Sequence, residues 1–338
     1  MQPLHPSWPP PPFQQRWPWI GPDLQTIRDT VHPDRLPADQ GQPWTVAVPG
    51  GGSLLLVEDP PAHGQPRGWV LLVHGLGGSS SRPGVRRLAL ALQGQGFGVW
   101  RLNLRGAGAG RGLATGTYAA ACNTDLLPVL AAARLRAAGL PLLGAGLSLG
   151  GTVLLNALRE RPDGLDALAC VSSPLDLAAC AAQIDAPRNR LYQRVLLRGL
   201  IRQTLADALA QPFAAPLRSV RSIRQFDTAV TAPRWGYPTV AQYYSQASPL
   251  PALLSGATLP PTLLLHALDD PWVPAAALLR LQAQSPPWLD VCLPRHGGHN
   301  GFHAAARGSQ VTRASWADCC VVGWLRGASA DGHAGSGI

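Results

Sequence analysis

The sequence predicts an α/β protein built on one mostly parallel, doubly wound sheet. Short and almost wholly apolar segments recur along the 338 residues, and helix-like segments separate them. Strands buried under helices on both faces are typically such continuous apolar runs, and their alternation with helices indicates this architecture. The chain is 46% hydrophobic and only 14% charged, so it can bury a sizeable core, which excludes wholesale disorder.

The predicted elements follow a Pro-rich start. Residues 1–43 lack apolar periodicity, so we expect an extended arm on the surface. Two short apolar segments then flank the turn Pro-Gly-Gly-Gly at 49–52 and predict a hairpin. Segments typical of strands lie at 44–48, 53–57, 69–73, 98–102, 142–147, 167–171, 262–266 and 289–293. Helix-like segments lie at 85–95, 124–138, 152–159 and 275–284.

The alternation breaks once, between about residues 174 and 260. This stretch contains helix-like pieces such as 191–209 but no strand. An insertion of that length between two strands predicts a helical cap over one end of the sheet, within a main domain at 44–326. The last residues, 327–338, are rich in Gly and Ser, so we expect a disordered tail.

The charge pattern argues against a nucleic-acid-binding protein. The net charge is +9, but all 28 basic residues are Arg and they are scattered along the chain without a basic block. The first dozen residues lack the features of a secretory signal, and the longest uncharged stretch, 137–158, contains a Pro and five Gly. The six Cys form no C-x-x-C pair. We expect a cytoplasmic protein with reduced cysteines and no stable membrane anchor.

The first chemical signal is a G-x-S-x-G motif centred on Ser148. An apolar strand precedes it and a helix-like segment follows, which is the setting of a nucleophile elbow. Gly146 and Gly150 would let strand and helix approach a serine held in a strained backbone conformation. The alternative is a glycine-rich structural turn whose serine has no catalytic role.

A serine needs a base, and a base needs an orienting acid. His299, in a loop after the last strand, is the candidate base, and His296 nearby is more typical of a solvated loop histidine. Asp270 follows the strand at 262–266 and is preferred as the acid, although position alone separates it poorly from Asp269. The order Ser148, Asp270, His299 is that of hydrolases with this sheet.

Acyl transfer also requires donors for the oxyanion of the tetrahedral intermediate. The N–H of Leu149, directly after the serine, is one candidate. The other is the N–H of Leu76 in His-Gly-Leu-Gly-Gly at 74–78, directly after a strand, with the His74 side chain expected to orient the loop. A phosphate-binding loop is the alternative, but no Gly-Lys-Ser/Thr follows.

A metal site is a further alternative, because three histidines lie close together in sequence: His296, His299 and His303. Paired zinc ligands of the H-E-x-x-H kind need one helical face, and the glycines at 297, 298 and 301 disfavour a helix. We therefore expect no metal and no organic cofactor.

Many segments together resemble the YheT-like branch of the α/β-hydrolase family, which includes mammalian abhydrolase-domain phospholipases and medium-chain esterases. The similarity runs from Trp19 to about Trp324, and implies Ser148 as nucleophile, Asp270 as acid and His299 as base. The segments are WIGPDLQT (19–26), HGLGGSS (74–80), NLRGAG (103–108), GLSLGG (146–151), SPLDL (173–177), NRLYQR (189–194), QFDTAVTAP (225–233), YYSQASP (243–249), HALDDPWVP (266–274) and GGHNGF (297–302). The membrane-anchoring helix of the mammalian members has no counterpart, which implies a soluble enzyme.

The sequence therefore predicts a serine esterase that acts on short- to medium-chain acyl esters or lipids. Two alternatives are an enzyme that transfers the acyl group to an alcohol or attacks an amide, and a non-catalytic binding protein that retains the fold. In the expected cap, Leu191, Val195, Leu196, Leu200 and Leu205 recur at near-helical spacing, so they line an acyl pocket or simply pack. Five arginines beside them either steer anionic lipids or form a solvated face: Arg188, Arg190, Arg194, Arg198 and Arg202.

Overall fold

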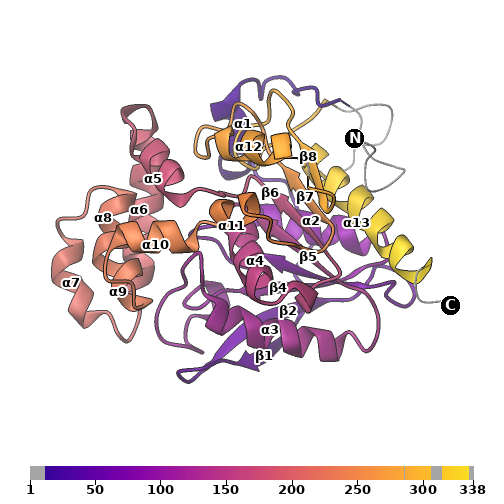
Figure 1. Ribbon diagram of the computed structural model, residues 1–338, viewed down its shortest axis with the longest axis horizontal. Helices are drawn as coiled ribbons and strands as arrows, with labels where there is room; N and C mark the ends of the chain where they lie inside the picture. The colour runs from indigo at the N-terminus through magenta and orange to yellow at the C-terminus, as the bar shows by residue number, and fades with distance from the viewer. Residues whose placement is uncertain (1–11, 285, 306–313, 335–338) are drawn as a thin grey trace.

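The computed structural model describes residues 12–284, 286–305 and 314–334. Within them, one sheet runs in the order β1-β2-β4-β3-β5-β6-β7-β8 (Figure 1). β2 pairs antiparallel with β1 and with β4, and every other pair is parallel. The strands are β1 (Gln42–Ala47), β2 (Ser53–Asp59), β3 (Trp69–Val73), β4 (Gly98–Asn103), β5 (Leu142–Leu147), β6 (Ala167–Val171), β7 (Thr262–Leu265) and β8 (Leu289–Cys292). The predicted mostly parallel sheet and its eight strands are confirmed.

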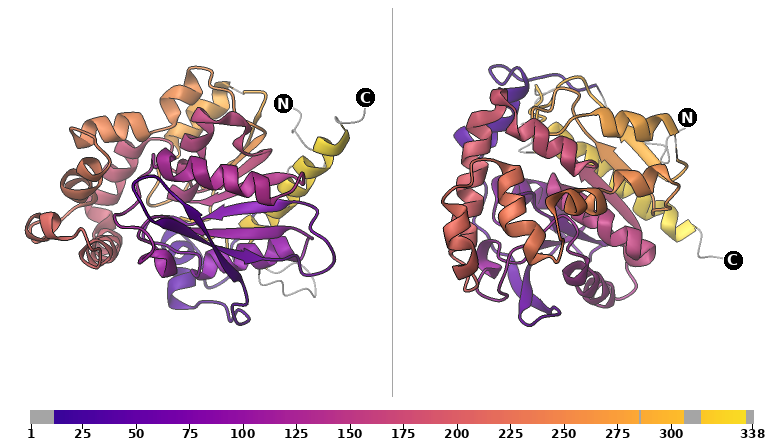
Figure 2. Two further views of the ribbon diagram at one scale, coloured as in Figure 1. Left: turned by 90° about the horizontal axis from the view of Figure 1, so that it is seen from below. Right: turned by 60° about the vertical axis from the view of Figure 1, so that its left-hand side comes forward.

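Helices cover both faces of the sheet (Figures 1 and 2). α2 (Pro83–Gln93) and α13 (Trp316–Ala334) pack on one face through a cluster that includes Leu88 and Trp324. α3 (Asn123–Arg136), α4 (Leu149–Glu160) and α12 (Ala276–Gln284) contribute to a second cluster on the other face. The sheet is therefore doubly wound, as predicted.

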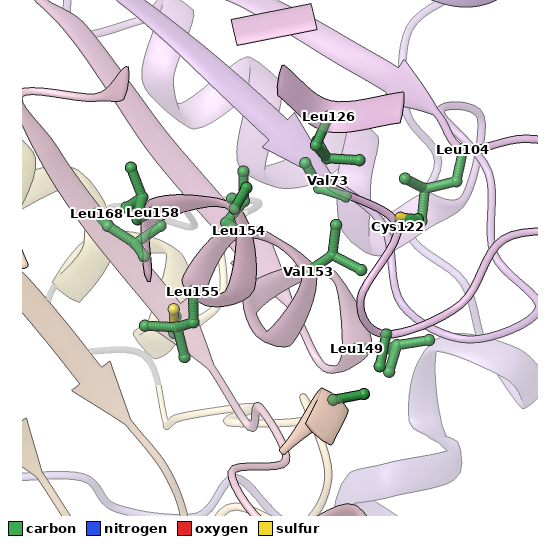
Figure 3. Close-up of a cluster of buried hydrophobic side chains, with 14 of the residues drawn as sticks. Val73, Leu104, Cys122, Leu126, Leu149, Val153, Leu154, Leu155, Leu158 and Leu168 are labelled. Carbon is green, nitrogen blue, oxygen red and sulfur yellow. The ribbon is translucent and has the colours of Figure 1, made fainter. Parts of the chain in front are cut away.

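α4 is the most deeply buried of the helices that touch the sheet, because residues 149–158 are all buried. Figure 3 shows its leucines and Val153 beside Val73 of β3 and Leu168 of β6. Full burial of such side chains stabilises the fold by roughly 1.5–3 kcal/mol each. The start of α4, and with it Ser148, is consequently fixed against the strands.

Residues 174–260, here called the helical insertion, lie between β6 and β7, and all but their last helix, at 250–254, form the lobe on the left of Figure 1. They have a small core of their own, which includes Ile184, Leu200 and Phe226. The helices are α5 (Leu177–Asp185), α6 (Arg190–Leu205), α7 (Gln211–Leu217), α8 (Ile223–Phe226), α9 (Ala232–Arg234), α10 (Val240–Ala247) and α11 (Leu250–Leu254). Two shorter turns also belong to the insertion, the 3-10 helix η3 (Pro187–Asn189) and the π-helix η4 (Asp227–Thr231). Two further 3-10 helices, η1 (Gly108–Gly110) and η2 (Pro162–Gly164), lie before it in the chain.

Two expectations about the ends of the chain are wrong. The arm at 1–43 contains a helix, α1 (Pro22–Val31), whose buried residues are Gln25 and Arg28. Because this helix buries a polar face, it leaves no apolar periodicity in the sequence. Residues 1–11 of the arm lie outside the described residues.

The tail from 327 onward is helical as far as Ala334, where α13 ends. Trp324 and Leu325 are fully buried and anchor this helix, and adding residues to an existing helix costs far less than starting one. The Ala- and Ser-containing segment therefore continues as helix despite its composition. Residues 335–338 lie outside the described residues.

Candidate active site

Ser148 stands at the sharp turn between β5 and α4. Its backbone is left-handed, with φ 52° and ψ −125°, a costly conformation for a residue with a side chain. A Cβ on Gly146 would lie 2.3 Å from the Cα of Gly151, and one on Gly150 would lie 2.2 Å from the carbonyl oxygen of Val73. Only glycine fits at both positions, which is the steric role that the motif predicts.

The structure brings three predicted side chains together at the carboxyl ends of β5, β7 and β8. His299 Nε2 lies 2.9 Å from Ser148 Oγ, and His299 Nδ1 lies 2.8 Å from Asp270 Oδ2. The side chains of His299 and Asp270 are buried, whereas Ser148 is partly exposed. This geometry allows a proton to pass from the hydroxyl to the imidazole while the carboxylate orients the ring.

The carboxylate of Asp270 is held ionised by its neighbours. Burial by itself raises the pKa of Asp270, but the nearby imidazoles of His299 and His266 and the N–H of Val273 outweigh it, and the net pKa is lowered. Asp270 Oδ1 also accepts hydrogen bonds from the N–H groups of Trp272 and Val273, at 2.8 and 3.0 Å.

Asp269, the alternative acid, has different partners. Its Oδ1 accepts a hydrogen bond from the N–H of Gly298 at 2.9 Å, and its Oδ2 lies 3.2 Å from Nδ1 of the exposed His296. Asp269 thus ties down the loop that carries His299 and makes no hydrogen bond to the imidazole. The structure separates two aspartates that the sequence leaves ambiguous.

Leu76 and Leu149 are placed as candidate oxyanion donors. Both line the same pocket as Ser148, and a Cβ on the neighbouring Gly75 would come within 2.9 Å of Ser148 Cβ. Neither the Leu76 N–H nor the Leu149 N–H donates a hydrogen bond to another described residue. Leu149 also begins a helix, whose positive dipole end favours a developing negative charge.

Two buried side chains fix the loop around Leu76. The N–H of Leu104 donates to His74 Nε2 at 3.2 Å, so the proton of the neutral ring is on Nδ1, which donates to the carbonyl of Gly75 at 2.8 Å. Burial lowers the pKa of His74 to about 4, which keeps the ring neutral. The hydroxyl of Tyr118 accepts a hydrogen bond from the N–H of Gly77 at 2.6 Å, a contact that no motif signals.

Helix α1 supports the catalytic loop from the opposite end of the sequence. Thr26 Oγ1 accepts a hydrogen bond from the N–H of His299 at 2.9 Å. Gln25 binds the backbone of His303 twice, accepting from its N–H at 2.7 Å and donating to its carbonyl at 3.1 Å. The chemistry of Gln25 and Thr26 does not by itself predict a role in supporting the catalytic loop. The only indication in the sequence is that both residues belong to the WIGPDLQT segment.

Trp272 lies against the imidazole of His299. The two rings are stacked, with centroids 4.5 Å apart and an interplanar angle of 29°. Trp272 also contacts Tyr192 of α6 in an edge-to-face arrangement, with ring centroids 5.3 Å apart. An aromatic face stabilises a cation that lies over it, so this stack favours the imidazolium that forms during proton transfer.

A pocket extends from Ser148 and His299 into the helical insertion, and most of its lining is apolar. The apolar lining residues from the insertion include Pro174, Leu177, Cys180, Ala181, Ile184, Leu196, Leu200 and Ile223. One carboxyl group also faces it, that of Asp227 in the π-helix η4, which accepts hydrogen bonds from Thr231 and Tyr244. Burial raises the pKa of Asp227 to about 6.

The leucine stripe of α6 is divided between two environments. Leu196 and Leu200 line the pocket, whereas Leu191, Val195 and Leu205 are exposed to solvent. The expected acyl-pocket role therefore fits only two of the five residues.

The three histidines considered for a metal site do not converge. His296 pairs with Asp269, and the buried His303 lies 3.4 Å from Asp29 of α1. Across residues 12–284, 286–305 and 314–334, no cluster of three or more His, Cys, Asp or Glu side chains has the geometry to hold a metal ion. In the same residues, no helix combines the length and apolar character needed to cross a bilayer.

This sheet, with a serine at the strand–helix elbow and a histidine and an aspartate at neighbouring strand ends, defines the class of α/β-fold hydrolases. The family model described as "Serine aminopeptidase, S33" matches residues 64–288. The protein named "Putative esterase YheT" from Escherichia coli (strain K12) is 31% identical over 272 residues, which cover 78% of each chain. The chain belongs to this S33 family of α/β-hydrolases, in the group that includes YheT, and it is a hydrolase.

Other similar proteins agree with this assignment. Human "Phospholipase ABHD3" is 30% identical over 239 residues, which cover 69% of this chain and 58% of that protein. The structure of the Pyrococcus furiosus esterase Pf2001 superposes with a TM-score of 0.55 at 13% identity, covering 94% of this chain and 98% of the other. An esterase from Thermogutta terrifontis gives 0.52 at 19% identity, covering 85% and 99%. Similarity this low in sequence shows the fold alone.

Proposed function

We propose that this chain hydrolyses carboxylic esters through an acyl-enzyme on Ser148. The observation that carries the proposal is the continuous hydrogen-bonded series from Asp270 through His299 to Ser148 Oγ. The names of the YheT and ABHD3 relatives, an esterase and a phospholipase, support an ester as the bond that is cleaved.

In the first half of the reaction, His299 Nε2 takes the proton of Ser148 as Oγ bonds to the ester carbonyl carbon. The carbonyl electrons move to oxygen, where the Leu76 and Leu149 N–H groups stabilise the negative charge. The tetrahedral intermediate then expels the alkoxide, which takes the proton from His299. Asp270 keeps the imidazole in the correct tautomer and stabilises its charged form.

In the second half, His299 takes a proton from water as the water oxygen bonds to the acyl carbon. Collapse of the second intermediate breaks the acyl–Oγ bond, releases the carboxylic acid and returns the proton to Ser148. The lining of the pocket is apolar near Leu177 and Leu200, and no arginine is among the described residues that line it, which favours an uncharged acyl chain of a small-molecule ester or a lipid.

The proposal is tested with a series of p-nitrophenyl esters of increasing acyl length. Ser148→Ala should lose at least roughly a thousandfold in kcat on every ester. Ser245→Ala, at an exposed serine of α10, is the matched control and should retain wild-type rates. Turnover that survives in the Ser148 variant rejects the proposed nucleophile.

A further inference from the structure

Helix α6 has two opposite faces with different surroundings. Leu196 and Leu200 point into the pocket that contains Ser148. With about 100° between successive residues, the opposite side of the helix carries Leu191, Val195 and Leu205. The helix is therefore a wall of the pocket on one side and a part of the molecular surface on the other.

The outer face exposes large apolar side chains at helical spacing. Leu191 is 75% exposed, Val195 67% and Leu205 48%. Arg198 and Arg202 fall between them, and all five positions lie within an arc of about 80°. We call these five residues the α6 outer face. Exposed leucines occur singly on most proteins, but an ordered stripe of them indicates an interaction surface.

The charge of this surface has one sign. Residues 190–205 contain no Asp or Glu. Arg194, Arg198 and Arg202 form no ion pair with any residue in the described parts of the chain, in contrast to buried arginines such as Arg101, which binds Asp59. Unpaired arginines beside exposed leucines are complementary to a surface that is both anionic and apolar.

The start of helix α1 lies beside the first turn of α6. Asp23 accepts hydrogen bonds from Arg188 and from the hydroxyl of Tyr192, both at 2.9 Å. The same N-terminal segment exposes Trp17, which is 81% accessible, and Ile20, which is 52% accessible. Trp is enriched at the interface between a membrane and water, where its amphipathic ring sits at the level of the lipid headgroups.

We infer that the α6 outer face docks this protein on an anionic lipid surface, as a helix lying in the plane of the membrane interface. The leucines and Val195 enter the boundary of the acyl chains, and the arginines bind lipid phosphates. A membrane offers both chemistries at once along the whole stripe. Docking is a property separate from ester hydrolysis, because it needs no catalytic residue. It would also place helix α6, which forms a wall of the substrate pocket, against the lipid.

The test measures co-sedimentation of the full chain with vesicles of phosphatidylcholine, with and without phosphatidylglycerol. All proteins carry Ser148→Ala, so that the lipids stay intact. The parent should bind only the anionic vesicles and dissociate at high salt. Each arginine near an anionic surface strengthens binding roughly fivefold, so Arg198→Gln with Arg202→Gln should weaken it about 25-fold. Leu191→Ser with Val195→Ser should weaken it roughly tenfold or more.

Matched controls change similar residues elsewhere. Leu135→Ser alters a leucine of α3 that is 82% exposed, and Arg161→Gln alters an exposed arginine. Both controls should bind as the parent does. The outer-face substitutions in the Ser148-containing protein should leave the hydrolysis of a water-soluble ester unchanged, which shows that they fold and separates failed docking from failed catalysis.

Several outcomes overturn docking. One is equal binding to neutral and anionic vesicles, and another is undiminished binding by either double variant. Absence of binding by the parent also overturns it. A parent that is dimeric by light scattering, becomes monomeric with Leu191→Ser and Val195→Ser and ignores vesicles would assign the α6 outer face to a second copy of the chain instead.

Discussion

The hydroxyl of Thr26 accepts a hydrogen bond from the backbone N–H of His299, 273 residues later in the chain, at 2.9 Å. The same hydroxyl donates to the carbonyl of Pro22 at 2.7 Å, so its direction is fixed. The imidazole that contacts Ser148 is therefore positioned partly by a helix that belongs to neither the sheet nor the helical insertion.

Replacing Thr26 should affect catalysis more than substrate binding. In Thr26→Ala the N–H of His299 loses its acceptor. The loop that carries His299 then becomes more mobile, so the imidazole is held less firmly beside Ser148. We expect kcat to fall about tenfold, which corresponds to about 1.4 kcal/mol, with KM little changed. Thr26→Ser keeps the oxygen and should restore the rate. Equal kcat values for the two variants would contradict the positioning role of Thr26.

Asp270 and Asp269 form a natural matched pair. Asp270→Asn removes the carboxylate that orients and stabilises the imidazole, and a loss in kcat on the order of 10⁴ is expected at neutral pH. Asp269→Asn disturbs only the loop contacts to Gly298 and His296, so its kcat should fall by less than about tenfold. Steady-state kinetics on one ester compares them directly. A larger loss in the Asp269 variant would reverse the assignment.

Asp227 should make stability depend on pH in an unusual direction. Its pKa in the folded protein is raised from 3.8 to about 6, so the native state binds this proton more tightly than the unfolded chain. The free energy of unfolding should therefore fall as pH rises from about 4 through about 6, and the loss should be complete above that pH.

Asp227→Asn removes this titration and keeps a polar group beside Thr231 and Tyr244. Its free energy of unfolding, measured in urea, should match the wild type near pH 4 and exceed it by on the order of 2 kcal/mol near pH 7. Asp163→Asn, at an exposed carboxylate, is the control and should show no such difference. An Asn variant that is less stable than wild type at pH 7 would refute the raised pKa.

The buried arginine of α2 should contribute far more to stability than an exposed one. Arg87 Nε lies 2.6 Å from Asp318 of α13, and its guanidinium also binds Asp29 of α1. Arg87→Met leaves Asp318 without its cation and Asp29 with Arg28 as its remaining arginine, and should lower the free energy of unfolding by about 3–5 kcal/mol. Arg134→Gln, which breaks the exposed pair with Asp166, should cost less than about 1 kcal/mol. Urea unfolding measures both variants. Equal losses of unfolding free energy in Arg87→Met and Arg134→Gln would contradict the larger contribution of the buried arginine.

The sheet could be predicted from sequence because its strands are continuous apolar runs bounded by Gly and Pro. The placement of Ser148 and His299 followed, since residues after parallel strands meet at one edge. Helix α1 was missed because the side chains it buries, Gln25 and Arg28, are polar and their partners are far away in sequence. The choice between Asp269 and Asp270 likewise depended on which carboxylate turns toward the imidazole, a property of loop geometry.

The α6 stripe shows a related limit. Helical spacing identifies a set of leucines on one helix but not which of them contact other atoms. Leu200 is buried in the pocket and Leu191 is three-quarters exposed, although both belong to the same apolar pattern.

The most direct test of the account is the site of covalent labelling by a fluorophosphonate, which reacts with a serine only when a base activates it. Intact-protein and peptide mass spectrometry should find a single adduct on Ser148, absent in Ser148→Ala and formed much more slowly in His299→Ala. Adduct formation at another residue, or equal labelling rates with and without His299, would contradict the proposed nucleophile and its base.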